Sequence, residues 1–90
     1  MLWNDVGFLL RNKTAKKIIE HIASKNSPVM PSEIAKSLDI SLKNVSTRLG
    51  YLAERKLIRC LNPEEKKGRL YIITKKGKEA LEKVKHRTIE

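Results

Sequence analysis

Residues 31–54 contain two amphipathic helical patterns with only a tight turn between them, and this spacing constrains the fold more than any other feature of the chain. Pro31 suits the first turn of a helix, and Glu33 suits the positive end of its dipole. The apolar side of this first helix consists of Ile34, Ala35 and Leu38. Asp39 and Ile40 make the turn, and a second helix follows them. Two helices joined by so short a turn predict a helix-turn-helix.

The second helix is predicted over residues 42–54, with Ser41 as its N-cap. Its apolar residues recur at spacings of three and four, as on one face of a helix. They are Leu42, Val45, Leu49 and Leu52. The other positions carry cationic or hydrogen-bonding side chains, and no acidic residue occurs before Glu54. These side chains are Lys43, Asn44, Thr47 and Tyr51, with Ser46 and Arg48 on the flanks. A solvated helix usually pairs Glu with Lys, so this composition favours contact with an anion.

After residue 56 the sequence period changes from that of a helix to that of strands. Residues 57–62 and 70–74 are rich in β-formers and are predicted to pair as a hairpin. The loop between them has the sequence PEEKKGR, in which Pro63 fixes φ at the start and Gly68 supplies a positive φ. A helix-turn-helix followed by a two-stranded hairpin is a winged helix, and the loop at residues 63–69 is its wing.

Further helical patterns flank this unit. Residues 14–25 are predicted to form an amphipathic helix. Its apolar side consists of Ala15, Ile18, Ile19 and Ile22. A final helix is expected from Lys75 onward, with Thr74 as its cap. Residues 2–10 are loosely helical, and Asn4 or Asp5 could cap this segment.

The predicted fold class is therefore mostly α with a two-stranded β-hairpin (α+β). The architecture is a winged helix-turn-helix in the order α-α-α-β-β-α, with room for an extra helical turn at the N-terminus. A chain of 90 residues suits one compact domain, and no linker, repeat or low-complexity segment divides it. Residues 1–90 are therefore predicted to form a single winged-helix domain.

The charge balance indicates a polyanionic partner. Twenty Lys and Arg residues face ten Asp and Glu residues, which gives a formal net charge of +10. An excess this large in a small domain favours nucleic acid or a membrane surface, although it also suits a merely soluble basic surface. No run approaches the roughly 18 apolar residues of a spanning helix, and the N-terminus lacks the basic lead of a signal peptide. We expect a cytoplasmic, nucleoid-associated protein with no membrane partner.

The sequence offers no support for catalysis. His21 and His86 are far apart, Cys60 is the only cysteine, and no cluster has the spacing of metal ligands. No nucleophile, base and orienting acid suggest themselves, and no glycine-rich phosphate loop is present. Cys60 alternates with Ile58 on the predicted strand and is expected to be a small core residue. The chain is predicted to be no enzyme, with no cofactor and no metal.

Double-stranded DNA is the predicted partner, because its major groove admits one α-helix and its phosphates repel carboxylates. Lys43 and Arg48 can contact phosphate or guanine, and Asn44 can pair with adenine. The wing can reach the neighbouring minor groove, where Arg is favoured. The alternative for the wing is a charged turn that only keeps the hairpin soluble. The predicted DNA-binding residues are Ser41, Lys43, Asn44, Ser46, Thr47, Arg48, Tyr51, Lys66, Lys67 and Arg69.

Two segments resemble known regulators. PSEIAKSLDISLKNVSTRLGYLAERKLI resembles the helix-turn-helix of MarR-like and ArsR-like bacterial and archaeal regulators. LNPEEKKGRLYIITKKGKEAL is similar to the wing and following helix of small archaeal winged-helix transcriptional regulators. The resemblance implies a sequence-specific regulator with residues 42–54 in the major groove and Arg69 near the minor groove. MarR-type proteins are longer and use long terminal helices for dimerisation and effector binding.

Three functions are compatible with the sequence. The leading hypothesis is a transcriptional regulator that binds DNA as a homodimer, because helix-turn-helix proteins commonly contact two half-sites. The candidate interface residues are Leu2, Trp3, Val6, Leu81 and Val84. A non-specific architectural protein of the chromatin type is the alternative, and an RNA-binding or protein-binding winged helix is the third. The sequence indicates neither the operator nor any small-molecule effector.

Overall fold

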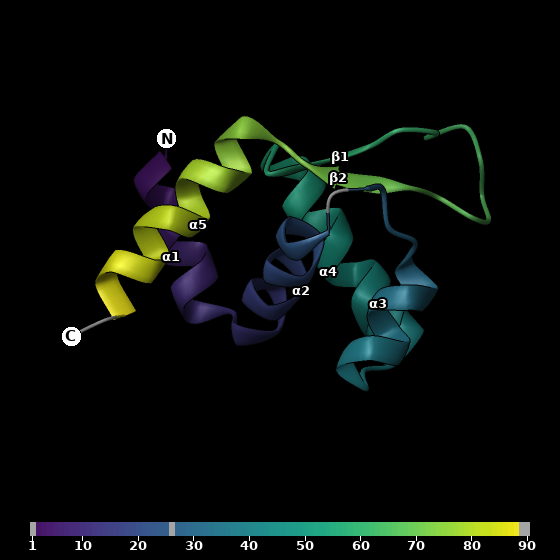
Figure 1. Ribbon diagram of the computed structural model, residues 1–90, viewed down its shortest axis with the longest axis horizontal. Coiled ribbons are helices and arrows are strands. Elements are labelled where there is room, and N and C mark those ends of the chain that lie inside the picture. The colour runs from purple at the N-terminus through teal and green to yellow at the C-terminus, as the bar shows by residue number, and fades with distance from the viewer. Residues whose placement is uncertain (1, 26, 89–90) are drawn as a thin grey trace.

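A computed structural model describes residues 2–25 and 27–88, which form five helices and a two-stranded hairpin (Figure 1). In chain order the elements are α1 (Leu2–Arg11), α2 (Lys13–Ser24), α3 (Pro31–Leu38), α4 (Leu42–Glu54), β1 (Ile58–Cys60), β2 (Tyr71–Ile73) and α5 (Lys75–Thr88). The predicted fold class and element order are confirmed. The extra N-terminal turn proves to be a complete helix of ten residues.

The helix starts follow local capping chemistry. The Ser41 hydroxyl accepts a hydrogen bond of 3.1 Å from the backbone N–H of Asn44, as the N-cap prediction requires. The Thr74 hydroxyl accepts one of 3.0 Å from the N–H of Gly77 and thereby caps α5. Asn12 caps α2, which begins one residue earlier than predicted. These side chains satisfy backbone donors that a helix start leaves without partners.

The hairpin strands are antiparallel, and Ile58 faces Ile73 while Cys60 faces Tyr71. Both strands are shorter than the sequence predicted. The predicted positive φ at Gly68 is confirmed, at 69°. The structure adds a pairing that was not predicted, because Val29 and Tyr71 exchange two backbone hydrogen bonds of 3.0 and 2.9 Å. This single pair ties the segment before α3 to the free side of β2.

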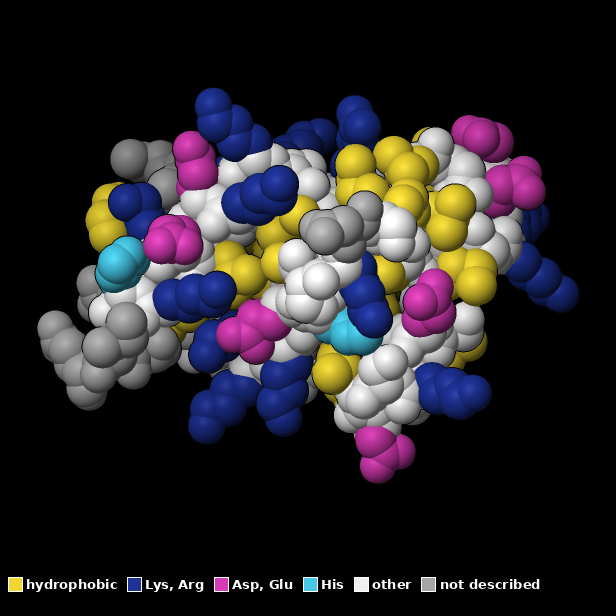
Figure 2. All heavy atoms as spheres, viewed as in Figure 1, with side chains coloured by type: hydrophobic (Ala, Val, Ile, Leu, Met, Phe, Trp, Pro, Cys, Tyr) yellow, Lys and Arg dark blue, Asp and Glu magenta, His cyan; other side chains and the backbone are white. Residues whose placement is uncertain are grey.

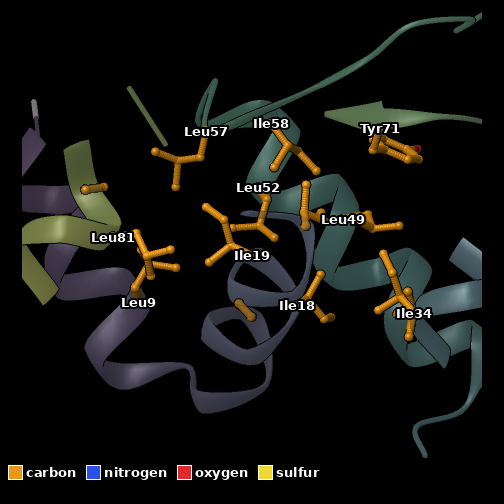
Figure 3. Close-up of a cluster of buried hydrophobic side chains, with 14 of the residues drawn as sticks. Leu9, Ile18, Ile19, Ile34, Leu49, Leu52, Leu57, Ile58, Tyr71 and Leu81 are labelled. Carbon is orange, nitrogen blue, oxygen red and sulfur yellow. The ribbon is translucent and has the colours of Figure 1, made fainter. Parts of the chain in front are cut away.

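The hydrophobic core lies where all five helices and the hairpin meet (Figure 3). Ile18 and Ile19 of α2 point into its centre and lie among side chains from the other elements. The buried face of α4 consists of Val45, Leu49 and Leu52. Leu42, which the periodicity also assigned to this face, is 53% exposed, so that part of the prediction is wrong. As the first residue of α4, Leu42 lies beyond the core.

The first and last helices pack side by side at one end of the molecule (Figure 1). Val6 of α1 and Leu81 and Val84 of α5 are buried within this chain's own core. Their prediction as dimer-interface residues is therefore wrong, because the contact between α1 and α5 already covers them. Trp3 remains 57% exposed, and the side chain of Leu2 lies outside the described part of the chain.

Because α1 begins at Leu2, Asn4 and Asp5 both lie within the helix, and the prediction that either residue caps it is wrong. Asp5 is buried in the first turn of α1. Its carboxylate lies 3.2 Å from a guanidinium nitrogen of Arg55 and 3.1 Å from the ammonium of Lys76. Lys76 also donates a 2.9 Å hydrogen bond to the backbone carbonyl of Arg55. A buried carboxylate needs such partners, and here they join α1 to the end of α4 and the start of α5.

The approach of α5 to the hairpin requires glycine at position 77, which is buried. A Cβ atom there would overlap the carbonyl oxygen of Leu57 and lie 2.8 Å from Cγ1 of Ile73. We therefore expect Gly77→Ala to lower the free energy of unfolding by about 1–3 kcal/mol through overpacking. Urea denaturation followed by circular dichroism would measure this loss.

Gly50→Ala is the matched control, because a Cβ at this helical position would meet nothing within 4 Å. We expect it to raise the free energy of unfolding by about 0.5–1 kcal/mol, the usual gain from replacing an unstrained helical glycine. Equal stability changes in the two variants would contradict the close approach at Gly77.

Candidate nucleic-acid interface

A groove of about 480 Å³ separates α4 from the wing. From α4 and the wing, it is lined by Leu42, Ser46, Gly50, Lys66, Lys67, Gly68 and Arg69. The start of α3 and β2 complete it with Met30, Pro31, Ser32 and Tyr71. No acidic side chain is among the described residues that line the groove. Its chemistry is therefore apolar and hydroxylic on the α4 side and cationic on the wing side.

Three of the predicted DNA-binding residues form a strip on α4 beside this groove. Lys43, Thr47 and Tyr51 are all exposed and follow one another at intervals of four residues along the helix. The hydroxyl of Thr47 donates a 3.0 Å hydrogen bond to the backbone carbonyl of Lys43. Its proton is thereby engaged within the helix, which leaves the Thr47 methyl group and the oxygen lone pairs for a ligand.

Three other predicted residues of α4 and its cap have more restricted side chains. Asn44 and Arg48 are half-buried, and Nε of Arg48 is enclosed without a hydrogen-bond partner among the described residues. The Ser41 oxygen is occupied by the N-cap bond, although its hydroxyl proton can still be donated. The structure thus places the freely accessible groups of α4 at Lys43, Thr47 and Tyr51, with Ser46 facing the groove.

The far end of the strip is supported from α1. The rings of Phe8 and Tyr51 meet edge to face, with centroids 6.4 Å apart and an interplanar angle of 86°. The guanidinium of Arg55 lies 4.1 Å from the centroid of the same Phe8 ring and also pairs with Asp5. Sequence reasoning missed Phe8, because no local pattern indicates a contact between residues so far apart in the chain.

Two side chains brace the wing from within. Arg69 donates hydrogen bonds to the backbone carbonyls of Glu65, at 2.5 Å, and Pro63, at 3.2 Å. Asn62 accepts a 2.8 Å bond from the Leu70 N–H and donates one of 3.2 Å to the Gly68 carbonyl. Asn62 was not predicted to matter, although its position at the base of a glycine-containing loop is typical of a turn residue.

The cations at the wing tip keep their charge unpaired within the described structure. Lys66 and Lys67 are exposed and form no ion pair with any described acidic side chain. Cys60, at the base of the wing, is half-buried against the core, and its thiol lies 3.6 Å from Oδ1 of Asn62. Four of the predicted DNA-binding residues line the groove: Ser46, Lys66, Lys67 and Arg69.

The described residues contain no group of three or more His, Cys, Asp or Glu side chains arranged to hold a metal ion. Across residues 2–25 and 27–88, no helix combines the length and the apolar character needed to cross a membrane.

Comparison with known proteins places this arrangement in a family. Among solved structures, the crystal structure of a MarR family transcription regulator matches with a TM-score of 0.70 and 18% sequence identity. The match covers 81% of this chain and 48% of that one, so the chain spans about half the length of its structural relative. No curated protein matches the sequence. Residues 11–89 match the family model for the winged helix-turn-helix, and the chain belongs to the winged helix-turn-helix family.

Proposed function

We propose that this protein is a sequence-specific transcription regulator that binds double-stranded DNA. In this proposal α4 occupies the major groove, and the wing lies near the adjacent minor groove. The observation that carries the proposal is the acid-free surface formed by the strip on α4 and the groove beside it, which is bounded by unpaired wing lysines. Duplex DNA fits this surface, because its major groove admits a helix and its phosphates attract the cations of the neighbouring loop.

The surface offers both kinds of contact that specific DNA binding needs. Lys43, Lys66 and Lys67 supply exposed positive charge for phosphates, which sets affinity and position. Hydroxyl and amide groups on α4, notably Ser46, supply the donors and acceptors that base edges recognise. The 13 residues of α4 give a helix about 20 Å long, enough to lie along a major groove.

We further propose that the protein acts as a homodimer on the nucleoid in the cytoplasm. Trp3 and Leu10, both on α1, are exposed and lie seven residues apart, so they share one face of the helix. The ammonium of Lys83 lies 5.2 Å from the centroid of the Trp3 ring, which borders this face with charge. An apolar α1 face could meet its copy across a two-fold axis, as closed dimers require.

The alternative of a non-specific architectural protein draws support from the wider charge distribution. Figure 2 shows Lys and Arg side chains at several separate places on the visible face, including its upper and lower edges, with a hydrophobic patch at the upper right. Such a distribution adds a salt-dependent affinity for any duplex. The acid-free face of α4 is less suited to a protein-binding adaptor, unless its partner is acidic.

Selection of bound duplexes from a random pool separates the first two functions. We expect the selected site to be preferred over random DNA by about a thousandfold or more at a fixed salt concentration. A homodimer predicts inverted half-sites with centres about 10 base pairs apart. If repeated rounds enriched no sequence while the protein bound all duplexes tightly, the result would instead favour the architectural protein.

Replacing Lys43 and Thr47 by alanine tests the docking face, because both side chains are exposed and their loss should leave folding intact. We expect weaker binding to every duplex, with the slope of log affinity against log salt reduced by about one for the lost lysine. Lys78→Ala is the matched control, since Lys78 is exposed on α5 and does not line the groove. If the double replacement and Lys78→Ala weakened binding equally, the DNA would not dock on the strip of α4.

Arg69→Ala is expected to weaken DNA binding by about 1 kcal/mol. The loss would combine any contact with the minor groove and the two hydrogen bonds that hold the wing. Arg69→Lys keeps the charge but cannot form both bonds in the same geometry, so we expect it to recover only part of the affinity. Titrations of the selected duplex would measure these affinities. Unchanged affinity in both variants would show that the wing is a charged turn that does not contact DNA.

A further inference from the structure

Leu42 is an apolar side chain exposed at the start of the helix that we assign to the DNA major groove. It is 53% exposed, whereas the three apolar residues of the buried face of α4 are at most 1% exposed. The core therefore does not account for it. A single exposed leucine is common on protein surfaces, so only its position can give it meaning.

Its position is on the groove rather than on a remote surface. Leu42 lines the groove together with Ser46 and Gly50, which follow it at intervals of four residues on the same side of α4. At Gly50 an added Cβ would meet nothing within 4 Å, so the backbone there is open to close approach. Lys66 and Lys67 line the same groove from the wing. A duplex held by these lysines would present its base edges to the first turn of α4.

We propose that Leu42 is a specificity-determining residue that recognises the 5-methyl group of thymine. The inference rests on the proposed function, because it requires α4 in the major groove. Residues near the N-terminus of a recognition helix are those that contact base edges. The leucine side chain has no donor or acceptor, and thymine is the only DNA base whose major-groove edge carries a methyl group.

The neighbouring side chains leave this role to Leu42. Lys43 is a charged donor suited to phosphate or guanine, and Asn44 is half-buried with a polar amide. The nearest competitor is Thr47, whose methyl group stays available because its hydroxyl bonds to the Lys43 carbonyl. Thr47 lies on the adjacent line of the helix and does not line the groove, so the two residues would contact different base pairs.

Deoxyuridine substitution tests the inference, because uracil differs from thymine only by the absent methyl group. In the duplex obtained by selection, each thymine is replaced singly by deoxyuridine, and affinity is measured for the complete chain. We expect one or two positions at which the unmodified protein loses about three- to fivefold, the usual effect of one buried methyl group. Leu42→Ala should bind thymine and uracil equally at those positions.

Two controls separate this effect from others. Thr47→Ser removes the exposed methyl group of the strip and should leave the sensitivity at the Leu42 positions unchanged. Lys43→Ala should weaken both duplexes by the same factor. Because Leu42 is exposed, Leu42→Ala should unfold at the same urea concentration as the unmodified protein.

The outcomes distinguish the inference from the function on which it rests. Specific binding with no sensitive thymine, or sensitivity that persists in Leu42→Ala or disappears in Thr47→Ser, would overturn the role of Leu42 and leave the regulator proposal standing. Absence of any preferred duplex would overturn both. If Leu42→Ala lost the sensitivity to the thymine methyl group while Thr47→Ser and Lys43→Ala kept it, the contact between Leu42 and thymine would be established.

Discussion

Burial of one face of α4 determines which of its side chains a ligand can reach. Val45, Leu49 and Leu52 are buried where α4 packs against α2 and α3. Each such side chain contributes about 1.5–3 kcal/mol when removed from water, and a whole domain is stable by only about 5–15 kcal/mol. Rotating α4 about its axis would expose these residues and forfeit much of that stability. The outward direction of Lys43 and Thr47 is therefore fixed by the buried residues on the opposite face of the helix.

The end of α4 is fixed by a different kind of contact. Asp5 joins α1 to Arg55 and Lys76, and Arg55 lies over the ring of Phe8, which in turn meets Tyr51. Both cations are about one-third exposed, so solvent screens part of the attraction to the buried carboxylate. The main consequence is geometric, because α1, α4 and α5 meet at one point. The N-terminal helix thereby helps to set the position of Tyr51, the last residue of the strip on α4.

Features encoded by neighbouring residues were predictable, whereas features that depend on distant contacts were not. Ser41 as an N-cap and Gly68 at positive φ follow from chemistry within a few residues, and both predictions are confirmed. The pairing of Val29 with Tyr71 involves a single residue of the segment before α3. It therefore produces no alternating pattern in the sequence from which it could be predicted. The exposure of Leu42 could not be predicted, because periodicity gives the face of a helix but not where its neighbours end.

The residue types at the candidate site were predictable from the sequence, but the hydrogen bonds that hold the wing were not. The sequence indicated a cationic wing and a polar strip on α4, but not that Arg69 and Asn62 are hydrogen-bonded to the backbone of the wing. Hydrogen bonds of this kind depend on the path of the loop, which residue types alone do not specify.

The bracing of the wing has a consequence for how the two halves of the site work together. A flexible basic loop would lose conformational freedom on binding and so give up part of its affinity. In this protein Asn62 and Arg69 fix the loop before any ligand arrives, and Lys66 and Lys67 are left at its tip. The width of the groove between wing and α4 is then a property of the fold. In the proposed complex this fixed frame would hold α4 in one register against the bases, which the contact proposed for Leu42 needs in order to distinguish one base pair from the next.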